Sequence, residues 1–315
     1  MNDYSVSYFK RQNLLHTLLL LTGMLLLLGL IGWLIAGGIG AIWALVTGVS
    51  IIFITPKVSP KIILRLYGAR RMPHHISNQL SHVVQWLSDQ GHLSTRPELF
   101  YIPSNIMLAF STGMNDKASI AISEGLLRQL NLREMTAVLA HEISHIQSND
   151  IWVMSMADII SRLTQIMSLT GYLLILFYIP VFIFTGKEIP WLIFILLLTA
   201  PIISSLMQLA LSRTREFNAD MQACKLTGDP EGLISALTKI NYYEKHWLKR
   251  VILPNTKLPN PSLLRTHPLT EERIERLIEI TQDEKHPFTN TQNTITRFDN
   301  KLERKPKHRI TGLWH

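Results

Sequence analysis

The sequence predicts an α-helical, multi-pass membrane protein with an α+β core made of helices and a small antiparallel sheet. The membrane part is predicted because hydrophobic residues make up 47% of the 315 residues and the mean hydropathy is +0.17, both high for a soluble protein. These residues gather in four long apolar runs. The core is predicted because short β-prone segments and amphipathic helical patterns lie between and after the runs.

The four apolar runs form two pairs, each joined by a short turn. Residues 14–35 contain no Asp, Glu, Lys or Arg and are long enough to cross about 30 Å of hydrocarbon. A glycine-rich turn leads from them to the second run, residues 39–54. The third run, residues 169–185, lies close to the fourth, residues 189–209. A helix pair buried in a soluble core is the alternative for this second pair, because the third run is short.

Basic residues flank the apolar runs on one side of the membrane. They lie before the first run and after the second: Lys10, Arg11, Lys57, Lys61, Arg65, Arg70 and Arg71. The positive-inside rule therefore places both termini and residues 57–168 on the cytosolic side. This placement explains the net charge of +8 and the pI near 9.6. No nucleic-acid partner is predicted, because the chain has neither zinc-finger spacing nor a basic run interleaved with aromatic residues.

The runs divide the chain into five expected segments. These are an N-terminal two-span membrane hairpin at residues 1–56, the first part of the cytosolic core at 57–168, a second two-span hairpin at 169–210, the second part of the core at 211–282, and a basic polar tail at 283–315. The two core parts are expected to fold as one unit, because neither contains an internal repeat or an independent domain pattern.

Local patterns predict the elements of the core. Apolar residues at helical spacing predict a helix over residues 76–87, and three β-prone segments predict strands at 99–102, 107–110 and 119–122. Asn131 followed three residues later by Glu134 has the form of a capping box, which predicts a long helix from about Leu132. Two later helices are expected from Pro230 to about Trp247 and after Thr270.

The sequence His141-Glu142-Ile143-Ser144-His145 lies within this long helix, which contains neither Gly nor Pro here. Residues four apart share a helix face, so both imidazoles can reach one Zn²⁺ ion at about 2.0–2.1 Å. Glu142 is offset by one position and lies beside the metal. Its carboxylate can take a proton from the water molecule that Zn²⁺ acidifies, which makes it the candidate catalytic residue.

A third metal ligand is expected from elsewhere in the chain. Ser148 and Ile151 stand where the metzincin extension requires Gly and His, so that class is excluded. A glutamate from a second helix is the remaining solution, and Glu216 is predicted to bind the metal. Asp220, four residues later on the same face, is placed to accept a hydrogen bond from the far nitrogen of a ligating histidine. The single cysteine, Cys224, is expected to be a packed apolar residue rather than a ligand.

Two segments carry a family resemblance: residues 141–145 and residues 212–220, which read Ser-Arg-Thr-Arg-Glu-Phe-Asn-Ala-Asp. With the two pairs of spans and a late Thr266-His267-Pro268, they make the chain similar to membrane peptidases of the HtpX type, relatives of the CAAX prenyl endopeptidases. The resemblance implies a gluzincin-like zinc peptidase core with one Zn²⁺ per subunit. It implies endopeptidase activity on membrane or misfolded proteins in quality control, and a location in the lipid bilayer of a bacterial inner membrane.

Three further positions have more than one interpretation, and a fourth departs from the family pattern. The resemblance places His267 near the metal, where it would stabilise an oxyanion, and the alternative is a loop histidine before a helix. Arg213 and Arg215 would orient Glu216 or a substrate carbonyl, or they would simply mark the cytosolic end of a span. Leu108 stands where the family usually has Asn, so peptide binding is expected to differ in this chain.

The remaining polar candidates are expected to be solvated or capping groups: His74, His75, His82 and Asp150. Three functions stay open. The first is hydrolysis of an extended peptide that joins the sheet as an extra strand. The second is cleavage of a lipid-modified C-terminal peptide, against which the number of spans argues. The third is a membrane scaffold with structural zinc, against which Glu142 and the expected three-ligand site argue.

Overall fold

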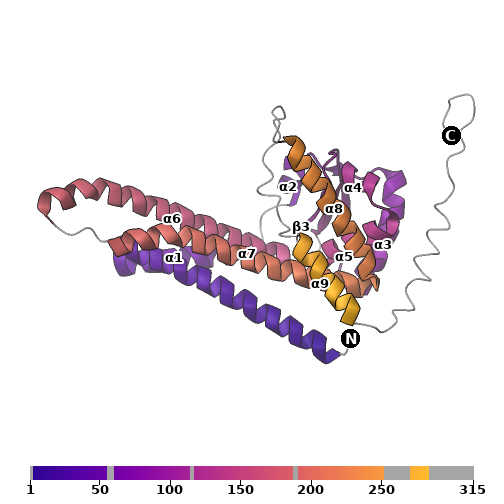
Figure 1. The fold of residues 1–315 in the computed structure, drawn as a ribbon, viewed down its shortest axis with the longest axis horizontal. Coiled ribbons are helices and arrows are strands. Elements are labelled where there is room, and N and C mark those ends of the chain that lie inside the picture. Colours follow the sequence, from indigo (N-terminus) through magenta and orange to yellow (C-terminus); the bar gives the residue numbers. More distant parts are fainter. Residues whose placement is uncertain (1–2, 55–59, 114–116, 187–190, 252–269, 284–315) are drawn as a thin grey trace, which may run out of the picture.

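The computed structural model describes residues 3–54, 60–113, 117–186, 191–251 and 270–283 (Figure 1). Three long helices, α1 (Asp3–Ile54), α6 (Asp150–Thr185) and α7 (Trp191–Thr227), lie side by side and extend away from a core of shorter helices and strands. All three are apolar and long enough to cross a membrane.

Exposure of the apolar side chains supports a membrane environment for these helices. In the most apolar 18-residue stretch of α6 and of α7, only 12% and 17% of the residues are buried. A helix pair buried in a soluble core would hide these side chains, so that alternative for the second pair of runs does not agree with the structure. An exposed apolar surface of this extent requires a lipid or protein partner.

The helix α1 contains both of the first two apolar runs. It is interrupted at Ala36 and Gly37, where Gly37 has a φ of 63°, and its two halves pack closely together. A Cβ atom on Gly32 would lie 2.5 Å from the carbonyl oxygen of Gly40, and one on Gly48 would lie 2.8 Å from a methyl group of Leu25. Glycine is therefore required at position 32, where a side chain would meet backbone, whereas the flexible end of Leu25 could move away from a side chain at position 48.

The core contains a four-stranded sheet in the order β1-β2-β4-β3. Its strands are β1 (Arg70–Arg71), β2 (Glu98–Ile102), β3 (Ala109–Thr112) and β4 (Ser119–Ser123). The expectation of a purely antiparallel sheet is wrong, because β2 and β4 pair in parallel while β1–β2 and β3–β4 are antiparallel. The cause is the position of β4: it forms a hairpin with β3 but inserts beside β2, where all five of its residues are buried.

Helices cover the sheet and complete the core. They are α2 (Pro60–Leu66), α3 (His74–Gln90), α4 (Glu124–Gln129), α5 (Leu132–Gln147), α8 (Pro230–Val251) and α9 (Thr270–Asp283). The central helix is α5, which is buried over nearly its whole length between β3, α3, α7 and α8. Its side chains Leu139 and Ile143 pack with Ile120 and Ile122 of β4 in the main hydrophobic cluster.

The capping box predicted at Asn131 and Glu134 is confirmed and begins α5. The chain then turns through Asn149, whose φ is 53°, and α6 begins at once with Asp150. Both α6 and α7 run without interruption from the core into their apolar portions. The expected segment boundaries after residues 168 and 210 thus fall inside single helices, because nothing in either sequence ends the helix at the edge of the apolar run. Most of the tail, from residue 284, lies outside the described residues.

Candidate metal centre

Helix α5 presents His141 and His145 on one face, one turn apart. The ring centroids are 4.6 Å apart, and both residues are buried. The helix is held at its start by Glu134, which accepts a hydrogen bond from the backbone of Asn131 and is also bound by Ser235 and Lys239 of α8. Because the capping box fixes where α5 begins, it also fixes which face of the helix carries the two histidines.

Glu216 of α7 approaches the two imidazoles from the facing helix. Its carboxylate oxygens lie 3.4 Å from His141 Nε2 and 3.6 Å from His145 Nε2, and the two Nε2 atoms are 3.1 Å apart. One ligand atom from each residue lies within 4.8 Å of the others. The structure thus brings the three predicted ligands together, although Glu216 is 71 residues beyond His145 in sequence.

The far nitrogen of each imidazole faces a buried carboxylate. His141 Nδ1 is 3.0 Å from Asp220 Oδ1, and His145 Nδ1 is 2.8 Å from Asp150 Oδ2. A carboxylate at Nδ1 holds the proton there and leaves Nε2 free to bind a metal. Asp220 lies where the sequence predicted it. Asp150 was expected to be solvated or capping, but it is 2% exposed and belongs to the centre.

The position of Asp150 depends on the left-handed turn at Asn149, which starts α6 beside the end of α5. No regular residue spacing predicts that turn, so this contact could not be read from helix periodicity. A Ser-Asn pair after a histidine helix is the one local signal, because Asn tolerates the left-handed conformation.

Arg273 of α9 is a second residue that the sequence did not single out for the centre. Its Nε and Nη2 atoms donate to the two oxygens of Asp220 at 2.7 and 2.6 Å, and Nη1 lies 3.0 Å from Glu216 Oε2. The side chain is 3% exposed. One guanidinium group therefore fixes both a candidate ligand and the carboxylate behind His141.

The two candidate arginines of α7 have different environments. Arg213 is exposed, whereas Arg215 is buried and donates from Nη1 to Asp150 Oδ1 at 2.8 Å. Arg215 thus acts on Asp150, the carboxylate that lies against His145. The remaining auxiliary candidate, His267, lies outside the described residues.

The charges of the centre fit a divalent cation. Four buried carboxylates and two buried guanidinium groups surround the imidazoles: Glu142, Asp150, Glu216, Asp220, Arg215 and Arg273. They leave a formal charge of minus two, which one divalent ion cancels. Burial would lower the pKa of both imidazoles, yet the surrounding carboxylates raise the pKa of His141 to about 9 and raise that of His145 as well. The same negative charge that attracts protons to the rings would attract a metal ion.

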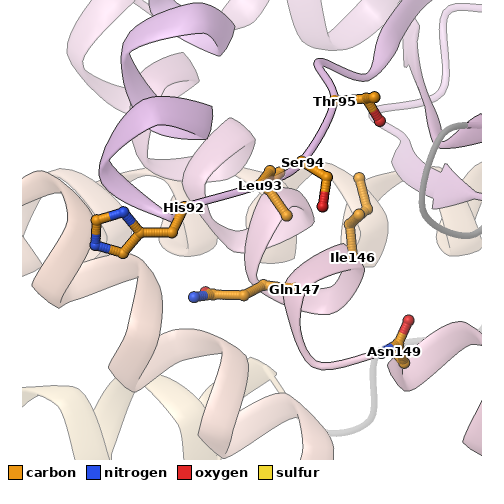
Figure 2. Close-up of a pocket in the computed structure, with 7 residues that line it drawn as sticks. All are labelled: His92, Leu93, Ser94, Thr95, Ile146, Gln147 and Asn149. Atoms are coloured by element: carbon orange, nitrogen blue, oxygen red, sulfur yellow. The ribbon is translucent and has the colours of Figure 1, made fainter.

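A cavity lies near the C-terminal end of α5. This cavity, of about 150 Å³, lies between the 92–95 loop and the end of α5 (Figure 2). Gln147 extends across it toward His92 and donates from Nε2 to the carbonyl oxygen of Gly91 at 3.0 Å. None of the candidate ligands lines this cavity.

Comparisons with known proteins identify the family of this chain. Residues 75–281 match the model of Peptidase family M48. The chain is 34% identical over 287 residues to the "Protease HtpX homolog" of Campylobacter hominis, covering 85% of this chain and 98% of that protein. It is 33% identical to the protein of the same name from Burkholderia ambifaria, over 85% of this chain and 97% of the other. Among solved structures, S. mikatae Ste24p matches with a TM-score of 0.48 and 23% identity over 86% of this chain and 67% of that chain.

The sequence match, the apolar helices and the buried His-His-Glu centre define a membrane metalloprotease. The chain belongs to Peptidase family M48.

Proposed function

We propose that the protein is a zinc-dependent endopeptidase that hydrolyses peptide bonds of membrane or misfolded proteins on the cytosolic side of the membrane. The observation that carries the proposal is the convergence of His141, His145 and Glu216, with Glu142 on the same helix as the two histidines. Two imidazole nitrogens and one carboxylate are a set of protein ligands typical of catalytic zinc sites.

Bound there, zinc would supply Lewis-acid chemistry, polarising the scissile carbonyl and acidifying the attacking water. Glu142, 2% exposed, would take the proton of that water and deliver it to the leaving amine. Asp220 and Asp150 would hold the imidazole rings in one tautomer throughout. The guanidinium of Arg273 would keep Glu216 and Asp220 charged and oriented.

The sheet offers a place for an extended substrate. Strand β3 is the last in the sheet order and packs beside α5, and no strand within the described ranges pairs with its outer edge. A peptide would add there as a further strand, bound by main-chain hydrogen bonds. Leu108, just before β3, packs with Phe110 in a small apolar cluster and has no side-chain amide to offer a substrate. We therefore expect sequence preferences that differ from those of relatives with Asn at this position.

The cytosolic orientation rests on the basic residues around the apolar runs. No acidic residue occurs between Ile54 and Asp89, whereas five lysines and arginines do. This asymmetry supports a cytosolic core under the positive-inside rule, and a bacterial inner membrane is the location we propose. Labelling of single introduced cysteines from either side of sealed vesicles tests the orientation, with Cys224 replaced first.

The catalytic proposal is tested with purified full-length protein and casein as substrate. Glu142→Gln is expected to keep stoichiometric zinc and to lose at least 99% of the activity, since general-base catalysis contributes roughly 10²–10⁴-fold. Glu98→Gln changes an exposed carboxylate on β2 and serves as the matched control, with full activity expected. Equal hydrolysis by the wild type and Glu142→Gln would remove Glu142 from the mechanism. The inactive variant also allows bound peptides to be recovered from membranes.

A further inference from the structure

The N-terminal helix α1 contacts the metal centre through one buried hydroxyl group. Thr17 is 4% exposed, and its Oγ1 accepts a hydrogen bond from Arg215 Nη2 at 2.6 Å. The same oxygen donates to the carbonyl oxygen of Asn13, 2.8 Å away in its own helix. Thr17 is therefore fixed in α1 and holds a guanidinium group of α7, 198 residues further along the chain.

A continuous series of hydrogen bonds leads from this hydroxyl to a candidate ligand. Arg215 Nη1 donates to Asp150 Oδ1 at 2.8 Å, and Asp150 Oδ2 lies 2.8 Å from His145 Nδ1. Each carboxylate oxygen of Asp150 thus has its own partner. The series joins three long helices, α1, α7 and α6, to the histidine helix α5, and Figure 1 shows the first three running together.

Within the described residues, two hydrogen bonds hold the guanidinium group of Arg215, one to Asp150 and one to Thr17. The residue is 9% exposed, and its Nε atom has no hydrogen-bond partner among the described residues. Asp150 therefore holds one end of the group, and Thr17 holds the other. Without the hydroxyl, a second buried N–H group would lose its partner, and the guanidinium would be free to rotate about its bond to Asp150.

A second polar contact places α1 at the same level of α7. Asn13 Nδ2 donates to Asn218 Oδ1 at 3.2 Å, and Asn218 Nδ2 lies 3.5 Å from Ser148 Oγ, at the end of α5. Together with the Thr17 contact, one turn away along α1, this contact fixes both the rotation and the height of α1 relative to α7. The helix is thus positioned specifically against the centre rather than merely packed nearby.

We propose that Thr17 is a positioning residue for the metal ligand His145, so that the first apolar helix contributes to metal retention. The inference rests on the proposed function, because it requires that the centre holds zinc. The hydroxyl fixes Arg215, Arg215 fixes Asp150, and Asp150 fixes the tautomer and direction of the imidazole.

The test uses the full-length protein in detergent or nanodiscs, loaded with zinc. Thr17→Val removes the hydroxyl at nearly constant volume, and Thr17→Ser keeps it. Thr164→Val is the matched control, because Thr164 is also buried in an apolar helix, but its hydroxyl donates, within the part of the chain that the structure describes, only to the Ile160 carbonyl of its own helix. The measurements are the rate of zinc transfer to a chromogenic chelator and the visible absorption of the cobalt-loaded protein, which reports ligand geometry.

Thr17→Val is expected to release zinc about three to ten times faster than the wild type, less than the roughly 10- to 100-fold effect of losing a direct partner of a ligand. Its cobalt spectrum is expected to change. Thr17→Ser and Thr164→Val should stay within about twofold of the wild type in release rate, with unchanged spectra. Should Thr17→Val fail to accumulate, Thr17→Ala replaces it with the same expected result.

A double-mutant cycle identifies the route. In an Arg215→Met background, Thr17→Val is expected to add less than about twofold, because the hydroxyl acts through the guanidinium. If the wild type binds zinc and cleaves casein, but Thr17→Val and Thr164→Val release zinc at equal rates, this inference alone is overturned. A wild type that binds no zinc would overturn the proposed function together with it.

Discussion

Replacing Arg273 with methionine is the sharpest test of how the metal centre is held. The guanidinium group makes two hydrogen bonds to Asp220 and lies 3.0 Å from Glu216, and the side chain is 3% exposed. Methionine fills much of the same volume but provides neither charge nor donors. The substitution therefore leaves two carboxylates buried without their cation.

The expected loss of stability follows from that burial. Removing one partner of a buried ion pair costs about 3–5 kcal/mol, because the other charge stays buried and uncompensated. For a protein of this size such a loss lowers the melting temperature by on the order of 10 °C. The loss is expected to be larger in the metal-free protein than in the zinc-loaded protein, because a divalent cation partly replaces the missing positive charge.

The assay is thermal unfolding of the full-length protein in detergent, followed by circular dichroism with zinc and with a chelator. Arg273→Lys should fall between the wild type and Arg273→Met, since lysine keeps the charge but not the fork of donors. Arg276→Met is the control on the same helix, because this exposed arginine lies over the ring of Phe217 and should contribute only about 0.5–1 kcal/mol. If metal-free Arg273→Met melts within about 1 °C of the wild type, the reasoning from the buried charges is refuted.

Three further outcomes are expected. Asp150→Asn should weaken zinc binding roughly 10- to 100-fold without removing a ligand, measured by competition with a chelator, and unchanged affinity would separate Asp150 from the centre. Burial alone would raise the pKa of Glu134, but hydrogen bonds from Lys239, Ser235 and the Asn131 backbone lower this pKa. The ionised Glu134 side chain therefore stabilises the fold fully above the ordinary pKa of glutamate. This stabilisation is lost as the pH falls through the lowered pKa. Glu134→Gln should therefore cost roughly 1–2 kcal/mol at pH 7, with a difference from the wild type that shrinks below about pH 4 in unfolding curves; a constant difference would contradict this. Removing the metal with a chelator should lower the melting temperature, and adding zinc back should restore it in proportion to the logarithm of its concentration.

The local features of the site could be predicted from the sequence because they depend on neighbouring residues. The capping box at Asn131 sets the start of α5, and the four-residue spacing places His141 and His145 on one face. The apolar runs could also be predicted, since length and composition alone identify a candidate membrane helix. Asp220 could be placed because it shares a helix face with Glu216.

The contacts that were missed depend on tertiary structure. Asp150 reaches His145 only through the left-handed turn at Asn149, and Arg273 reaches the centre only because α9 packs against α7. Spacing also could not separate Arg213 from Arg215, because residues two apart lie on different faces and either face could be the buried one. The parallel pairing of β2 with β4 was missed for a similar reason, since the insertion of β4 beside β2 is decided by burial and not by the nearest hairpin.

The uninterrupted course of α6 and α7 has a practical meaning for anyone who wishes to isolate the catalytic part. Asp150 lies in the first turn of α6 and Glu216 lies about three turns from the end of α7, so each carboxylate is carried by a helix that continues into an exposed apolar portion. A water-soluble fragment made by excising the apolar stretches would cut the supports of the site itself.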